Sequence, residues 1–207
     1  MKPIVASLLL ASSLVCPAQE GPLHLIKIEK IEATVQETPV YAAKGPRDKD
    51  AESRQWIEIE AEMVLVTKDP SGFLPQLDAK WFAILIDGTT KKPVQLTGTC
   101  SFKDVRPEAS TRDKKVHLSA YISPDTLQKV TQEKTLRPND IQSVALVVSG
   151  PNIANDAKYA AGLQKASSKE ESEWWTKSLY PTIDGAILPK SKTPFALLWT
   201  DRYPGEK

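Results

Sequence analysis

The feature that most constrains the fold is a series of short segments in which apolar and polar residues alternate. Successive side chains of a β-strand point to opposite faces, so such alternation indicates strands with one buried face. Clusters of Pro, Gly, Asp and Ser separate the segments. This pattern predicts a mainly β protein, an immunoglobulin-like antiparallel β-sandwich of about seven strands. The predicted strands cover residues 24–35, 55–66, 80–87, 94–103, 116–122, 141–149 and 194–200.

Two of these segments depart from simple alternation. In residues 24–35 the period of two slips by one position near Lys30, which a β-bulge would absorb. Residues 80–87 (KWFAILID) are apolar on both faces, as expected of a central strand that is covered on both sides. Asp87 and Gly88 then indicate a turn.

Helices are predicted in two places. Ser123 and Pro124 fit the N-cap and first helical position of a short helix after the fifth strand. The stretch before the last strand is far longer than a hairpin needs, and we interpret about residues 151–193 as a helical insertion. It would hold one helix over residues 155–166 (NDAKYAAGLQKA) and a second over 168–179, opened by a capping box from Ser168 to Glu171.

The N-terminus predicts export. Residues 1–18 combine a lysine, an apolar run over residues 4–15 and small residues before a cut after Ala18, the pattern of a signal peptide. Val15 precedes Cys16, where a lipoprotein signal would need a small residue, so lipidation of Cys16 is not expected. Residues 19–207 would form a single immunoglobulin-like domain with no transmembrane segment. We expect it in the periplasm, associated with the outer membrane, or secreted.

Composition narrows the chemistry. The whole chain has 27 basic and 26 acidic side chains, and removal of Lys2 with the signal peptide leaves 26 of each, so nothing favours nucleic acid as a partner. Cys100 is then the only cysteine, on the apolar face of its strand, and should be an inert core thiol. No metal or cofactor motif is present, and His24 and His117 are interpreted as surface histidines.

A row of carboxylates lies on one face of the second strand. Glu58, Glu60 and Glu62 alternate with apolar residues, and neighbours in the row would be about 6.5 to 7 Å apart, a spacing compatible with acid–base catalysis. A solvated strand face explains the row more simply, and a small hydrolase built on it is the less favoured alternative.

The five tryptophans divide into two groups. Trp56, Trp81 and Trp199 lie in or at the start of predicted strands and should pack in the core or at a sheet edge. Trp174 and Trp175 are adjacent within a charged segment, where a helix would point them about 100° apart. We expect one to dock the insertion on the sandwich and the other to line a groove, with burial of both as the alternative. With Tyr180, the pair forms the candidate binding site.

Three long segments carry a family resemblance: KWFAILIDGTTKKPVQLTGTCSFKDV, HLSAYISPDTLQKV and ILPKSKTPFALLWTDRYPGEK. With them, the chain resembles small exported proteins that verrucomicrobial (Akkermansia-type) gut bacteria encode beside type IV pilus assembly components. The resemblance implies an immunoglobulin-like fold, a place in the periplasm or on the outer surface, and a part in pilus-like assembly or host contact. It supplies no catalytic residues.

The sequence therefore favours an exported, non-enzymatic binding or assembly protein of the bacterial envelope, with envelope or pilus-assembly proteins as partners and no cofactor. The alternative is a sandwich that binds a small lipid or glycan through Trp174 or Trp175.

Overall fold

The computed structural model describes residues 24–39, 53–67, 72–107, 115–133, 137, 140–154, 157–162, 174–177 and 179–206. The predicted signal peptide, including Cys16, lies outside the described residues. Within them, no helix is long and apolar enough to cross a membrane.

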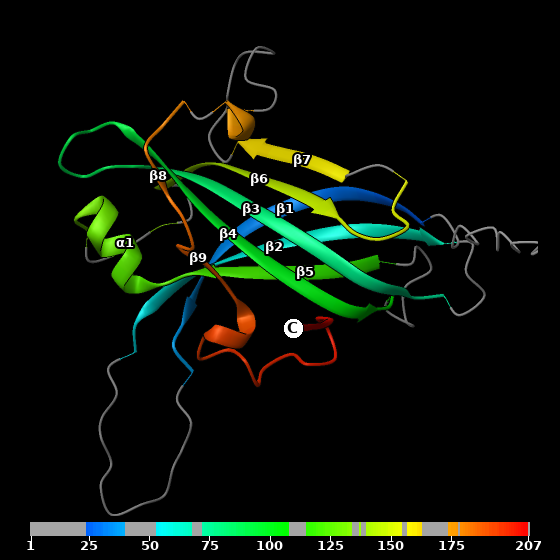
Figure 1. Cartoon of the computed structure of the whole chain (residues 1–207). Helices are drawn as coiled ribbons and strands as arrows, with labels where there is room; N and C mark the ends of the chain where they lie inside the picture. The colour runs from blue at the N-terminus through cyan, green and yellow to red at the C-terminus, as the bar shows by residue number, and fades with distance from the viewer. Residues whose placement is uncertain are drawn as a thin grey trace, which may run out of the picture.

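Two sheets pack face to face (Figure 1), which confirms the predicted β-sandwich. The four-stranded sheet has the order β1-β2-β5-β9, and the six-stranded sheet has the order β10-β4-β3-β6-β7 with β8 beside β4. The order of strands one, two and five in one sheet and three, six and seven in the other is that of an immunoglobulin-like sandwich, whereas β4 pairs with β3 and not with β5. The elements are β1 (His24–Glu37), β2 (Gln55–Thr67), β3 (Leu74–Ile86), β4 (Pro93–Val105), β5 (Lys115–Ile122), α1 (Pro124–Thr131), β6 (Ile141–Ser149), β7 (Ala157–Gly162), β8 (Thr182–Ile183), β9 (Ile187–Pro189), β10 (Gly205–Glu206) and the short 3-10 helices η3 (Trp174–Thr176) and η4 (Lys190–Lys192).

Several local predictions are confirmed. The register of β1 against β2 shifts between Ile28 and Lys30, where a bulge was expected. The Ser123 side chain accepts a hydrogen bond from the Thr126 backbone N–H, so α1 begins with the predicted cap. The Asp87 carboxylate accepts hydrogen bonds from the backbone N–H groups of Thr89 and Thr90, which fixes the predicted turn.

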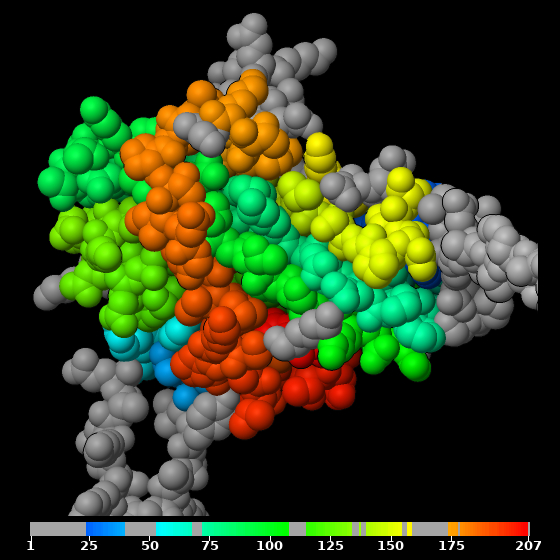
Figure 2. Space-filling model, viewed as in Figure 1, coloured from blue at the N-terminus to red at the C-terminus, as the bar shows by residue number. Residues whose placement is uncertain are grey.

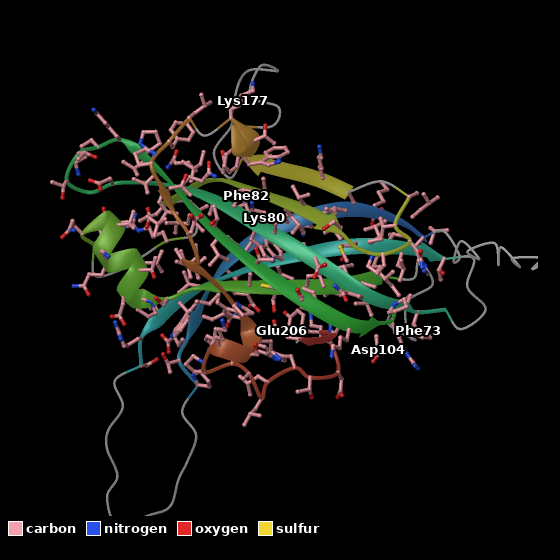
Figure 3. The ribbon with its side chains drawn as sticks, in the orientation of Figure 1. Phe73, Lys80, Phe82, Asp104, Lys177 and Glu206 are labelled. Carbon is pink, nitrogen blue, oxygen red and sulfur yellow. The ribbon has the colours of Figure 1, made fainter. Side chains whose placement is uncertain are left out.

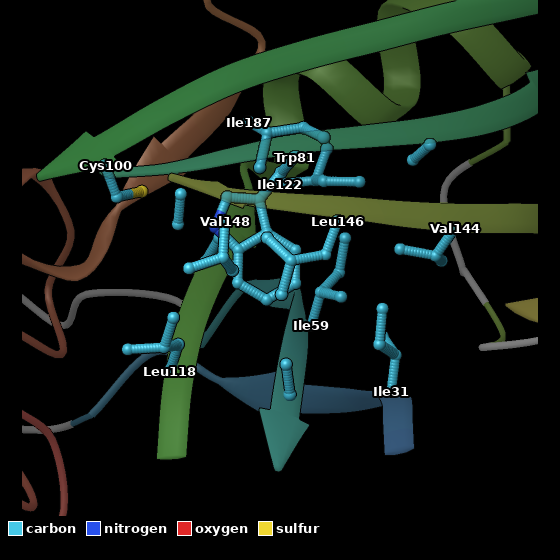
Figure 4. Close-up of a cluster of buried hydrophobic side chains, with 14 of the residues drawn as sticks. Ile31, Ile59, Trp81, Cys100, Leu118, Ile122, Val144, Leu146, Val148 and Ile187 are labelled. Atoms are coloured by element: carbon cyan, nitrogen blue, oxygen red, sulfur yellow. The ribbon is translucent and has the colours of Figure 1, made fainter. Parts of the chain in front are cut away.

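The core lies between the two sheets. Trp81 is fully buried there, among side chains that include Ile59 and Leu118 of one sheet and Leu146 of the other (Figure 4). Cys100 lies in the same core, as expected, and burial raises the pKa of its thiol to about 12. The thiolate is the reactive form, so this cysteine is inert while the protein is folded.

The predicted insertion differs from expectation in its first part. The helix expected over residues 155–166 is wrong, because the described part of that range forms β7, which pairs antiparallel with β6. The Ala- and Lys-rich composition favours a helix locally, but the edge of β6 offers backbone partners that override this weak preference. The described part of the second helix is the single turn η3. Residues 163–173 lie outside the described part of the chain.

The strand predicted over residues 194–200 is also wrong, because this stretch forms a series of turns. Its apolar residues instead cover the outer face of the four-stranded sheet, where Phe195 stacks on Tyr121 with 4.9 Å between ring centroids. Figure 2 shows the segment that follows η3 running across one side of the molecule towards the red C-terminal residues. The chain pairs with β4 through β8, with β5 through β9 and again with β4 through β10, so it closes this side of the sandwich.

Candidate functional site

The outer face of the six-stranded sheet carries an apolar cluster of its own. We call this set of residues the outer cluster: Phe82 and Ile84 of β3, Ala145 of β6, and Trp174 and Trp175 of η3, with Val147 and Tyr180 packed against them. This cluster explains why the sequence of β3 is apolar on both faces, since its inward residues serve the core while its outward residues receive the tryptophans.

The two tryptophans are both largely buried. Trp174 is 7% exposed and Trp175 is 8% exposed, and their rings meet edge to face with centroids 5.7 Å apart. This geometry is favourable for an aromatic pair. Both indoles are thus buried, as in the alternative interpretation, and both help dock η3 on the sheet, with Tyr180 packed against them.

A groove of about 560 Å³ lies beside Trp175. Its size is within the range of small-molecule sites. Lys80 and Phe82 lie close together on β3 beneath the turn that carries Lys177 (Figure 3). The groove is lined by Lys80, Phe82, Gln95, Thr97, Val147, Lys158, Trp175, Thr176, Thr182 and Asp184.

Two of the residues that line this groove each carry a buried polar atom that is unsatisfied. The side-chain oxygen Oε1 of Gln95 and the indole Nε1 of Trp175 have no hydrogen-bond partner among the described residues. Leaving a buried donor or acceptor unpaired costs about 1 to 3 kcal/mol, so such groups are rare in native proteins and call for an explanation. A bound group that pairs with both would supply one.

Hydrogen bonds fix the wall of the groove opposite η3. The Thr97 hydroxyl donates to the Asp184 carboxylate over 2.7 Å, and the Gln95 backbone N–H donates to the Pro181 carbonyl over 2.9 Å. These bonds hold the chain around β8 against β4, so Gln95 and Thr97 are buried although they point away from the core. The sequence did not identify Gln95 or Asp184 as site residues, because their proximity to Trp175 depends on contacts that are distant in sequence.

The carboxylate row on β2 is not the solvated face that we expected. Glu58 is only 5% exposed, and its carboxylate accepts hydrogen bonds from the hydroxyl groups of Tyr121 at 2.5 Å and Tyr203 at 3.2 Å. Gln36 donates to its other oxygen at 2.8 Å. Tyr203 brings the C-terminal segment over this strand, which no local pattern in β2 indicates.

Glu60 is held by the same segment. Arg202 donates to both of its oxygens, at 2.6 and 3.2 Å, and Tyr203 also donates to it. Burial opposes ionisation, but the hydrogen bonds from Arg202 and Tyr203 and the Arg202 charge outweigh it and lower the pKa of Glu60. Burial and the neighbouring carboxylates raise the pKa of the Tyr203 hydroxyl. Glu62 pairs with Lys115 at 2.6 Å. All three carboxylates thus serve packing and pairing, which disfavours the hydrolase alternative.

Three further residues differ from their predicted environments. His117 and His24 are buried rather than at the surface, and His117 Nδ1 lies 3.2 Å from a Glu60 oxygen. Trp199 is exposed rather than in the core. It lies in a turn with a positive φ of 50° and stacks on Phe195 with ring centroids 6.2 Å apart.

Arg202→Ala is expected to lower the free energy of unfolding by about 1 kcal/mol at neutral pH, because a bidentate pair within a network exceeds an ordinary surface pair. The folded-state pKa of Glu60 lies below its ordinary value of 4.5. The stabilisation is therefore present above pH 4.5 and is lost as the pH falls through the lowered value. Urea unfolding at several pH values should show the difference from wild type shrinking under acid conditions.

The control is Lys27→Ala, which breaks an exposed pair with Glu29 and should change the free energy of unfolding by less than about 0.5 kcal/mol. A difference between Arg202→Ala and wild type that stays constant down to about pH 3 would contradict the role assigned to Glu60.

The chain is similar to known proteins both in sequence and in structure. A protein-family model matches residues 18–207, which is nearly the whole sequence. The chain belongs to this family. A crystal structure of a protein from Akkermansia muciniphila is similar to it with a TM-score of 0.75 and 18% sequence identity, over 90% of this chain and 95% of that one. At this identity the likeness shows a shared fold, which agrees with the Akkermansia-type resemblance seen in the sequence. Among curated proteins, none matches the chain.

Proposed function

We propose that this family member is an exported, non-enzymatic binding or assembly protein of the bacterial envelope, and that it acts with type IV pilus-like machinery or in host contact. The predicted signal peptide supports export, and the sequence resemblance supports the link to pilus assembly. The observation that carries the binding role is the groove beside Trp175, where Gln95 and Trp175 present buried polar atoms without partners among the described residues.

The structure suggests how such a surface is built. The immunoglobulin-type core is complete without η3, since the two tryptophans pack on the outside of the six-stranded sheet. A rigid sheet holds Gln95 and Lys80, and a segment docked on it supplies Trp175. Binding residues placed on a rigid scaffold in this way lose little conformational entropy when a partner binds.

A second function favoured by the same groove is the binding of a small glycan or lipid. Its volume of about 560 Å³ suits a ligand of that size. The ligand-binding hypothesis predicts saturable binding of a small molecule, whereas the assembly hypothesis predicts stable capture of an envelope protein.

The test of the assembly role is affinity capture from envelope extracts of the source bacterium by the mature protein, with captured proteins identified by mass spectrometry. Lys80→Glu reverses a charge at the groove, and Lys129→Glu makes the same change on α1. Both lysines are exposed, so both variants should fold. We expect wild type and Lys129→Glu to capture a pilus-assembly component that Lys80→Glu loses. Equal capture by both variants would rule the groove out as the contact surface.

Export has a separate test. Mass spectrometry of the protein isolated from its own cells should show an N-terminus at Gln19, in the envelope fraction or the medium. A chain that retains Met1 and remains in the cytoplasm would contradict the proposed localisation.

A further inference from the structure

The unsatisfied atoms of the groove specify what a ligand must offer. Gln95 Oε1 needs a donor and Trp175 Nε1–H needs an acceptor, and both residues are more than nine-tenths buried. A hydroxyl group can donate one hydrogen bond and accept others. A ligand with several hydroxyl groups can therefore satisfy both atoms.

The charges that line the groove favour an anion. The described residues that line the groove include two lysines, Lys80 and Lys158, and one carboxylate, Asp184. One oxygen of Asp184 already accepts the Thr97 hydroxyl hydrogen bond. Lys80 is exposed, with its ammonium 5.2 Å from the centre of the Phe82 ring, so it can also bond to a carboxylate in the groove.

The apolar residues of the groove favour a sugar over an acyl chain. Phe82 and Trp175 are mostly covered by their packing in the outer cluster, so they leave little apolar surface for a lipid tail to bury. The polar side chains that line the groove, such as Gln95 and Lys80, instead suit the hydroxyl groups of a sugar.

We propose that the groove binds an acidic saccharide, with sugar hydroxyl groups paired to Gln95 and Trp175 and the acidic group held by Lys80. This inference rests on the proposed binding function and names the ligand class at the same site. The acid can be a carboxylate or a sulfate, since both present oxygens to an ammonium group in the same way.

Isothermal titration calorimetry with three tetrasaccharides tests the proposal. Hyaluronan tetrasaccharide carries carboxylates, chondroitin sulfate tetrasaccharide carries sulfates as well, and chitotetraose is neutral. We expect at least one acidic tetrasaccharide to bind at least about ten-fold more tightly than chitotetraose, because a hydrogen bond to a charged group contributes about that much. Added salt should reduce this preference.

Three variants locate the binding. Lys80→Ala should remove most of the preference for the acidic sugar, and Trp175→Phe, which keeps an aromatic ring but loses the indole N–H, should weaken binding of every tetrasaccharide. Lys129→Ala on α1 is the control and should bind as wild type does. Circular dichroism of each variant confirms folding, and Lys80→Ala keeps the test valid if Trp175→Phe fails to fold.

Three outcomes would overturn the inference: no tetrasaccharide binding, equal binding of acidic and neutral sugars, or an acid preference that Lys80→Ala leaves intact. Binding to phosphatidylglycerol vesicles in place of sugars would assign the groove to lipid and overturn it as well. If the sugars fail while Lys80→Glu still abolishes capture of an envelope protein, the proposed function stands without the saccharide.

Discussion

Gly98→Ala is expected to lower the free energy of unfolding by about 3 kcal/mol or more, at the upper end of the usual cost of overpacking. Gly98 lies on the inward face of β4, where Ile187 at the start of β9 approaches it. A Cβ atom there would lie 2.0 Å from the backbone carbonyl oxygen of Ile187. Backbone cannot move aside as a side chain can, so β9 would have to leave β5 or β4 would have to bend.

Gly205→Ala is the matched control, because Gly205 also lies in a strand of the six-stranded sheet and no atom lies within 4 Å of an added Cβ. We expect it to change the free energy of unfolding by less than about 0.5 kcal/mol. Urea denaturation monitored by circular dichroism measures both. If the two variants proved equally stable, the close approach of β9 to β4 would be disproved.

Phe195→Ala is expected to cost about 3 to 5 kcal/mol, as is usual when a large buried aromatic side chain is removed. Phe195 is 1% exposed, stacks on Tyr121 and meets Trp56 edge to face with ring centroids 5.8 Å apart. Its loss should loosen the C-terminal segment and expose the buried Glu58 carboxylate beneath it.

Leu197→Ala provides the comparison within the same segment, since Leu197 is 77% exposed and should tolerate truncation with less than about 0.5 kcal/mol of change. Chemical denaturation gives the free energies, and the rate of limited proteolysis reports detachment of the segment. A Phe195→Ala protein as stable and as protease-resistant as Leu197→Ala would show that the segment does not seal the sheet.

The strands of the sandwich could be predicted because each one bears its own pattern. In β2, Ile57 and Ile59 alternate with glutamates, and this alternation is enough to give the strand and its inward face. The apolar outward face of β3 also correctly indicated that another segment packs on that face. These signals are local, so they can be recognised without knowledge of the tertiary contacts.

The segments that pack on the outer faces of the two sheets could not be predicted, because their contacts join residues far apart in sequence. Tyr203 reaches Glu60 across 143 positions, and nothing near β2 indicates that a C-terminal turn will bury its glutamates. The apolar spacing of residues 194–200 is equally compatible with a strand and with a segment that packs over the outer face of a sheet. One local feature fits the close approach of β9 to β4, because Gly98 interrupts an otherwise apolar strand face.

The surroundings of the tryptophan pair could be predicted in part for the same reason. Two adjacent indoles in a charged segment need a wide apolar surface, and the outer cluster supplies it. The groove needed Gln95 and Lys80 from two other strands, and only the folded sheet brings them beside Trp175.

If the groove beside Trp175 is the contact surface of an exported binding protein, a reactive group placed in it should capture the partner. Photo-cross-linking in the source bacterium tests it most directly, with benzoylphenylalanine in place of Thr176, which is exposed in the groove, and in place of Lys129 on α1 as the control. We predict covalent adducts with an envelope component from position 176 that are absent from position 129. The absence of adducts at position 176, or identical adducts at both positions, would contradict the claim.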